Sequence, residues 1–255
     1  MMIGIKVGSS ILTEPGNGIR PGMIETICEQ IADLRQDGHD VFLVTSGAVA
    51  SDPDKLRDNS IRAAVGMGRL ICRYIDCFDE RKVEIAQVLL TDRDFEPESI
   101  KHLRRFFKST FSHKIVPIVN ANDVVDWKEL NRLAICADND WMFCNLCQVL
   151  RPDYAIIGFD QDGVLDGEGK VISEVSEGNY RQVMVVCRQT AGSSGHGEFG
   201  MQTKVDVLRQ LSLLGIGTLL ANGHAEEFIL KAVSELQGNP LGFGTRFKFD
   251  PQAAK

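Results

Sequence analysis

Six continuous apolar runs of strand length, separated mostly by segments of helical length, constrain the fold of this chain more than any other feature. Each run is continuous rather than alternating with polar residues, which is typical of a strand buried on both faces of a sheet. The runs are MIGIKV, DVFLVTS, VEIAQVLL, KIVPIVN, DYAIIGF and IGTLLAN. The helical segments span residues about 21–37, 57–77, 95–110, 138–150, 201–214 and 225–236. Repeated βα units predict an α/β fold with a mostly parallel open sheet covered by helices on both faces.

One segment departs from this alternation. Residues 158–173, GFDQDGVLDGEGKVIS, carry Asp-Gly and Gly-x-Gly turns that predict a small hairpin excursion. No internal repeat, low-complexity segment or linker divides the 255 residues. A chain of this length can bury a sizeable core in one unit, so we expect a single domain over residues 1–255.

Composition narrows the class of partner. The formal net charge of −7 disfavours a nucleic-acid surface, which needs a basic face, so we expect no nucleic-acid partner. No apolar stretch reaches the length of about 18 residues typical of a membrane span, and the N-terminus lacks the basic start and long apolar core of a signal peptide. We therefore expect a cytoplasmic protein that does not contact a membrane.

The cysteines suggest packing rather than chemistry. There are seven, an odd number, and without a secretion signal they are expected to be reduced thiols. Cys144 and Cys147 form a C-x-x-C pair with Cys136 nearby, which could be half of a zinc site or a redox pair. No second pair stands at zinc-like spacing, and WMFCNLCQVL has the pattern of a buried helix face. We therefore expect small core-filling thiols and no resident metal site.

Small and polar residues follow the apolar runs, at the carboxyl ends of the predicted strands. Ligands of open parallel sheets bind beyond these ends, so we expect one shared site there. Turn-forming residues also collect at strand ends for purely structural reasons, which is the alternative interpretation. The segments concerned are Lys6–Ser10, Thr45–Ala48, Asn120–Asp123, Ala137–Asp140, Asp160 and Asn222–Gly223.

Two lysines indicate that the ligand carries phosphate. Lys6 lies within an otherwise apolar strand, where its burial is costly unless an anion pairs with it or its ammonium group reaches solvent. Lys204 lies in the first turn of a predicted helix, where a cation is mildly unfavourable unless an anion is present. Gly8 and the amides after it can approach a phosphate closely. A nucleoside triphosphate would supply the anion, although the chain has neither a Walker A loop nor a protein-kinase signature.

The segment GHGEFGMQTK, residues 195–204, contains a G-x-G-x-x-G spacing and raises the alternative of a nicotinamide enzyme. That spacing is informative only in a tight turn from a strand into a helix, with an acidic residue about 20 positions later. Seven residues separate the apolar run VMVVC from Gly195, and after the next strand the chain has Asn222 rather than an acid. The segment therefore fits a nucleotide loop better than a dinucleotide-binding turn.

Nine short motifs follow one another along nearly the full length of the chain. They are KVGSSILT (6–13), VTSGAVA (44–50), AAVGMGRL (63–70), QVLLT followed by DF (87–95), PIVNAND (117–123), DND (138–140), DQDGVL (160–165), GMQTK (200–204) and GTRF (244–247). In this order they resemble the glutamate 5-kinases of the amino-acid kinase superfamily. Each motif alone is weak evidence, whereas nine in the family order are highly specific.

The resemblance implies a fold and a reaction. The fold would be a three-layer α/β/α sandwich whose N-terminal lobe, about 1–150, holds the amino acid and whose C-terminal lobe, about 151–250, holds ATP. The reaction would transfer the γ-phosphoryl group of ATP to the side-chain carboxylate of L-glutamate, the first step of proline biosynthesis, with Mg²⁺ arriving on the nucleotide. The resemblance also implies a homodimer or homotetramer and a functional link to a glutamyl-phosphate reductase.

The resemblance also assigns roles to residues. Lys6 and Lys204 would clamp the phosphates and Asp140 would hold the two lysines, which makes these three the expected catalytic residues. The amino-acid substrate is assigned to Ser46, Gly47, Asn120, Asp123, Asp138 and Asn139. ATP is assigned to Lys6, Gly8, Ser9, Asp160, Gly200, Met201 and Lys204. Helix capping and turn formation are the structural alternative for the Asp and Asn residues.

Several positions depart from the family pattern. Ala121 replaces the Glu of a loop that usually reads Asn-Glu-Asn-Asp, Phe159 replaces a Thr, and residues 196–199 replace a plainer loop. Asp52 stands near a usual glycine, and the PUA domain that many relatives carry is not expected after FKFDPQAAK. Two alternatives stay open: a phosphotransferase acting on another small amino acid or acid, and a non-catalytic ligand-binding member of the fold. The presence of all three expected catalytic residues disfavours the second.

Overall fold

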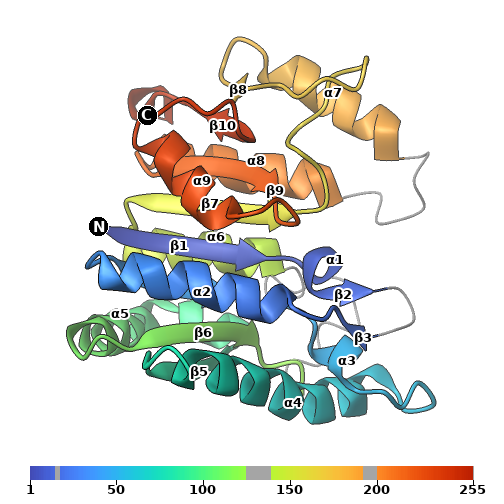
Figure 1. Ribbon diagram of the computed structural model, residues 1–255. Helices are drawn as coiled ribbons and strands as arrows, with labels where there is room; N and C mark the ends of the chain where they lie inside the picture. The colour runs from blue at the N-terminus through green and yellow to red at the C-terminus, as the bar shows by residue number, and fades with distance from the viewer. Residues whose placement is uncertain (15–17, 125–138, 192–199, 255) are drawn as a thin grey trace.

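The computed structural model describes residues 1–14, 18–124, 139–191 and 200–254. Among these residues the main sheet is open and has eight strands in the order β5-β6-β4-β1-β7-β9-β10-β8 (Figure 1). The strands are β1 Met2–Val7, β4 Asp40–Val44, β5 Ile85–Leu90, β6 Val116–Ala121, β7 Tyr154–Phe159, β8 Glu174–Val175, β9 Gly217–Asn222 and β10 Thr245–Phe247. Neighbouring strands pair in parallel, except that β10 runs antiparallel to β9. The α/β class with a mostly parallel sheet is thereby confirmed.

Helices cover both faces of the sheet and give the expected three layers (Figure 1). One face carries α5 Pro97–Ser112, α6 Asn139–Leu150, α7 Tyr180–Ala191 and α8 Gly200–Leu213. The other face carries α2 Met23–Gln36, α4 Asn59–Asp79 and α9 Phe228–Leu236. Shorter elements are α1 Ser9–Leu12, α3 Ala48–Ser51, the β2 Thr13–Glu14 and β3 Gly18–Ile19 hairpin, and the 3₁₀ turns η1 Asp92–Phe95 and η4 Pro251–Ala254. None of the described helices is long and apolar enough to cross a lipid bilayer.

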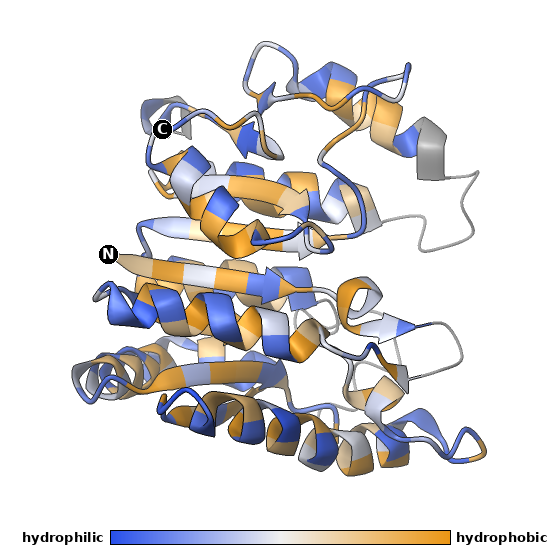
Figure 2. Cartoon of the chain, in the orientation of Figure 1, coloured by the Kyte–Doolittle hydropathy of each residue, from blue (hydrophilic) through white to orange (hydrophobic). Residues whose placement is uncertain are grey.

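The strands are apolar throughout because their successive side chains enter two different cores. In β4, Phe42 and Val44 pack into the core under α5, α6 and α8, whereas Val41 and Leu43 pack into the core under α2, α4 and α9. Figure 2 shows the same arrangement as orange stretches along the strands and orange stripes on helices that are otherwise polar. The sheet is therefore a rigid, doubly covered platform whose strand ends can hold a site.

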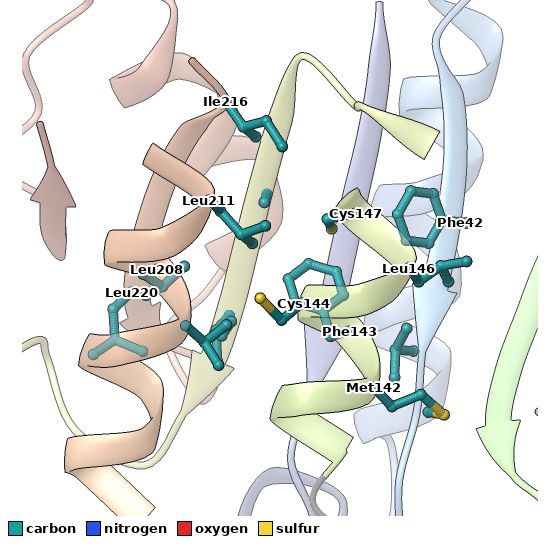
Figure 3. Packing of buried hydrophobic residues seen from close by; sticks show 14 of the residues in the cluster. Phe42, Met142, Phe143, Cys144, Leu146, Cys147, Leu208, Leu211, Ile216 and Leu220 are labelled. Carbon is teal, nitrogen blue, oxygen red and sulfur yellow. The ribbon is translucent and has the colours of Figure 1, made fainter. Parts of the chain in front are cut away.

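Helix α6 fills the middle of the first of these cores. Phe143, Cys144 and Cys147 are completely buried, and Figure 3 shows Cys144 on the side of α6 that faces Leu208 of α8. Burial raises the pKa of the Cys144 thiol to about 11 and raises that of Cys147 well above its ordinary value. In the part of the chain that the structure describes, no group of three or more His, Cys, Asp or Glu side chains could hold a metal ion. The two thiols are packing groups of the core, and Cys136 lies outside the described residues.

The six predicted strands and six predicted helices are present, with ends shifted by a few residues. The apolar run VMVVC, which is not among the predicted strands, forms part of helix α7. Two details differ from the expectations. Strand β5 is not buried on both faces, because it is the edge strand and exposes Gln87 and Leu89. The predicted hairpin at 158–173 is a loop closed by one antiparallel bridge, between Leu165 and Val171.

Candidate active site

A buried cluster of two lysines and one aspartate lies at the carboxyl end of the sheet. Nζ of Lys6 lies 2.5 Å from Oδ1 of Asp140, and Nζ of Lys204 lies 2.9 Å from Oδ2 of the same carboxylate. The side chains of Lys6, Asp140 and Lys204 are 6%, 3% and 14% exposed. The fold thus brings together three residues that lie far apart in the sequence and that the sequence predicted to act as one unit.

Each member of the cluster is placed by the end or the beginning of a regular element. Lys6 is next to last in β1, and because side chains alternate along a strand it lies on the face opposite Val7, toward α6. Asp140 lies in the first turn of α6, where the helix dipole favours a carboxylate. Lys204 lies one turn into α8 and also donates to the carbonyl oxygen of Gly200 at 3.2 Å.

The cluster carries one positive charge in excess. Burial by itself raises the pKa of Asp140, but the ammonium groups of Lys6 and Lys204 outweigh it and hold that pKa below its ordinary value of 3.8. The carboxylate is therefore ionised at neutral pH and compensates one of the two lysines. A second ammonium group in so buried a place is costly unless another anion approaches it. The charge balance favours a phosphate or carboxylate ligand.

A cavity of about 350 Å³ lies next to the cluster. Asn139 lines this cavity, and the next residue of α6, Asp140, forms the ion pairs with the two lysines. We call this cavity the strand-end cavity. Its lining residues are Ser9, Ser46, Gly47, Ala48, Val49, Ala50, Arg62, Asn120, Asp123 and Asn139. Five of the six positions assigned to the amino-acid substrate are therefore in one wall, and the sixth, Asp138, lies outside the described residues.

Hydrogen bonds fix two amide side chains in this wall. Nδ2 of Asn139 donates to Oγ of Ser46 at 2.7 Å, which ties the start of α6 to the end of β4. Oδ1 of Asn120 accepts the backbone N–H of Ala121 at 2.8 Å, whereas Nδ2 of Asn120 is buried and has no partner among the described residues. An unsatisfied buried donor is costly, so Asn120 marks a place where an acceptor atom of a ligand fits.

Two glycines shape the wall of the cavity. Gly47 has φ +95°, a left-handed conformation that lets the chain turn sharply from β4 into α3. Gly66 lies on α4 where α3 crosses it, and a Cβ there would lie 1.8 Å from the carbonyl oxygen of Ala48. The backbones of α3 and α4 therefore touch, which explains the glycine at position 66 of the AAVGMGRL segment.

The sequence reasoning missed one charged residue of the cavity, Arg62. It lies in the first turn of α4, and its Nε is buried. A cation in the first turn of a helix is the same signal that drew attention to Lys204. Arg62 was not singled out because α4 does not follow a strand directly, and only the close contact of α3 with α4 brings it to the cavity.

The positions assigned to ATP lie at neighbouring strand and helix ends. Gly8 joins β1 to α1, and Ser9 begins α1 and lines the strand-end cavity. Asp160 follows β7 and is exposed, and Gly200 and Met201 open α8 one turn before Lys204. Asp160 therefore lies at the end of β7 on one side of β1, whereas Ser9 shares the strand-end cavity with the residues that follow β4.

The departures from the family pattern fall into two groups. Ala121 and Phe159 are buried, with exposed fractions of 3% and 5%, and both pack into the core under α5, α6 and α8. Phe159 therefore offers packing where a polar residue was expected. Residues 196–199, including His196 and Glu198, lie outside the described residues.

The fold and the site define a member of a known class. The family model described as "Amino acid kinase family" matches residues 1–222, which include β1 to β9 and all three members of the cluster. The isopentenyl phosphate kinase of T. acidophilum has the same fold, with a TM-score of 0.61, 15% identity, and coverage of 97% of this chain and 100% of that one. The chain belongs to the amino acid kinase family.

Within that family, the chain is similar in sequence to curated glutamate 5-kinases. The glutamate 5-kinase of Chlorobaculum tepidum is 34% identical over 236 residues, which cover 87% of this chain and 63% of that protein. The glutamate 5-kinase of Symbiobacterium thermophilum is 33% identical over 250 residues, which cover 93% of each chain. The chain thus spans less than two thirds of the first relative and nearly all of the second.

Proposed function

We propose that this protein transfers the γ-phosphoryl group of ATP to the side-chain carboxylate of L-glutamate and forms L-glutamyl 5-phosphate, the first step of proline biosynthesis. The observation that carries the proposal is the buried cluster of Lys6, Asp140 and Lys204 beside a polar cavity of amino-acid size. The similarity to two glutamate 5-kinases over most of the chain supports the choice of acceptor.

The chemistry needs cations more than it needs a base. A glutamate side-chain carboxyl has an ordinary pKa of about 4.3, so at neutral pH it is already a nucleophile. One carboxylate oxygen forms a bond to the γ-phosphorus, the bond from that phosphorus to the bridging oxygen breaks, and its electron pair stays on ADP. The barrier comes from bringing two anions together and from the charge on the transferred group. Lys6 and Lys204 would stabilise that charge, and Asp140 would hold both ammonium groups in place.

The strand-end cavity would hold the amino acid. Ser46 and the amides of Asn120 and Asn139 would donate to substrate oxygens, and Asp123 would accept from the substrate ammonium group. Gly47 would bring its backbone close to the reacting groups, and Asp138 is proposed from the motif alone. The amino acid would then lie in the lobe formed by residues about 1–150.

ATP would lie on the other side of the cluster, against residues about 151–250. The proposed contacts are the backbone around Gly8 and Ser9, then Asp160, Gly200 and Met201. Both carboxylate oxygens of Asp140 already lie at lysines, so this carboxylate does not fit a metal ion. Mg²⁺ typically keeps several waters and binds substrate phosphates, and we propose that it arrives bound to the nucleotide.

The surroundings of the enzyme are proposed from the family resemblance. We propose a cytoplasmic homodimer or homotetramer. Because acyl phosphates hydrolyse readily, a glutamyl-phosphate reductase that takes up the product is the expected functional partner.

The test is ADP release from ATP with a panel of acceptors. We expect L-glutamate to turn over fastest, and Lys6→Ala, measured alongside, to lower its turnover by orders of magnitude. Turnover of another amino acid or small acid, with L-glutamate at background, would keep the phosphotransferase and replace its substrate. Binding of the ligands without turnover by any acceptor would indicate a non-catalytic member of the fold.

A further inference from the structure

Arg62 is the one cation among the described residues that line the strand-end cavity. It also lines a second cavity of about 620 Å³ between α3, α4 and the β2–β3 hairpin, which we call the basic cavity because Lys55, Arg69 and Arg73 share it. Arg62 therefore lines two cavities: the strand-end cavity, whose one acidic lining residue in the described part of the chain is Asp123, and the basic cavity, whose cations outnumber its acidic residues Glu14 and Asp52.

The hydrogen bonding of Arg62 is incomplete within the described part of the chain. Its Nε is buried and has no partner there, and its Nη1 reaches Oδ1 of Asn59 only at 3.5 Å. No carboxylate of these residues lies within ion-pair distance of Arg62. A guanidinium group offers five donors in a planar fork that matches a carboxylate, so this one is available for an external anion.

Arg69 of the basic cavity and the nearby Arg57 differ in this respect. Asp52 is buried and lies 3.3 Å from Arg57 and 3.8 Å from Arg69. Its carboxylate neutralises part of the positive charge of the basic cavity. Asp52 is also one of the positions at which the sequence departs from the family pattern. Arg62 has no carboxylate partner among the described residues and, unlike these arginines, it also lines the strand-end cavity, so its charge is available to a ligand there.

We propose that Arg62 is a specificity-determining residue that binds a second carboxylate of the acceptor. The proposal rests on the proposed function and deepens it, because one carboxylate must face the lysine cluster to receive the phosphoryl group. The other would pair with Arg62 while the ammonium group meets Asp123. The acceptor class is then an amino dicarboxylic acid, and a monocarboxylic amino acid or an amide at that position is rejected.

The experiment compares two acceptors in three proteins. L-glutamate carries both carboxylates, whereas its α-amide, L-isoglutamine, keeps the reacting one and replaces the other. In Arg62→Ala we expect kcat/KM for L-glutamate to fall about 10- to 100-fold, the worth of a charge-assisted hydrogen bond, with little change for the α-amide. Arg73→Ala is the matched control, since it removes an exposed arginine of the same helix that lines only the basic cavity. It should leave both values unchanged.

Equal losses for the two acceptors, or no loss for either, would overturn the role of Arg62. If the wild type does not phosphorylate L-glutamate, the proposed function fails, and the same comparison is made by calorimetric binding. Tighter binding of L-glutamate than of the α-amide, lost in Arg62→Ala, would then support the role of Arg62. Equal affinities in the wild type would overturn it.

Discussion

Lys6 and Lys204 contact the same carboxylate, that of Asp140. Lys6 comes from a central strand, and Lys204 comes from a helix nearly two hundred residues later in the chain. Each lysine takes one oxygen of Asp140, at 2.5 Å and 2.9 Å. The carboxylate therefore fixes the distance between two ammonium groups that would otherwise repel one another. A phosphoryl group passing between two bound anions needs such a pair of fixed cations.

Lys6→Ala tests whether the ammonium group of Lys6 contributes to catalysis. Removing one fixed cation should lower the turnover number about 10²- to 10³-fold, the usual effect of losing one donor to a charged transition state. The fold should survive, because Asp140 keeps Lys204 and the remaining pair is neutral. Steady-state kinetics and thermal unfolding check the two statements, and an unchanged rate would contradict the role of Lys6.

Asp140→Asn tests whether the carboxylate of Asp140 stabilises the two buried lysines. This change leaves two buried ammonium groups without a counter-charge, and breaking a buried ion pair in that way typically costs about 3–5 kcal/mol of unfolding free energy. We expect Asp140→Asn to be clearly less stable than Lys6→Ala in urea. Equal stability of the two variants would mean that the carboxylate does not hold the lysines together.

The stabilising effect of Asp140 should depend on pH in one direction only. Its pKa in the folded protein is below the ordinary value of 3.8, so its contribution is present above that value and is lost as the pH falls through the folded pKa. The stability difference between the wild type and Asp140→Asn should stay constant from about pH 8 to pH 5 and shrink only below about pH 3.8. Urea unfolding over this range measures it, and a difference that shrinks between pH 7 and pH 5 would contradict the depressed pKa.

Gly66→Ala tests how α3 shapes the strand-end cavity. The new Cβ would lie 1.8 Å from the carbonyl oxygen of Ala48, so α3 must move away from α4. We expect a loss of about 2 kcal/mol or more, as for other overpacked sites, together with a raised KM for the amino acid.

Gly68→Ala is the matched control for that change. Gly68 lies on the same helix, and a Cβ there meets nothing within 4 Å. Alanine is the better helix former, so this variant should be more stable by about 0.4–1 kcal/mol with an unchanged KM. Similar effects of the two substitutions would show that α3 and α4 do not need their close contact.

Much of this architecture could be predicted because the physical signals are local. A strand buried on both faces must be apolar throughout, so the central strands are visible in the sequence, and Lys6 stands out as a cation inside one of them. The run VMVVC lies in helix α7, where Val183 and Cys187, one helical turn apart, are buried and Val185 is exposed, so its burial follows the helical period.

What could not be predicted depends on contacts between distant elements. The order of the strands, the antiparallel β10 and the edge position of β5 follow from pairing choices that no single run encodes. Arg62 reaches the cavity only because α3 lies directly on Gly66. The sequence therefore pointed to the strand-end residues that line this cavity and missed Arg62 in its helical wall.

The most direct test of the central claim is to trap the product. The protein is incubated with ATP, Mg²⁺, L-glutamate and hydroxylamine, which converts an acyl phosphate into a hydroxamate. We predict γ-glutamyl hydroxamate in amounts that match the ADP formed, in the wild type and in Arg73→Ala but not in Lys6→Ala. ADP release without hydroxamate, or hydroxamate that forms equally well in Lys6→Ala, would contradict phosphoryl transfer to the glutamate carboxylate at this site.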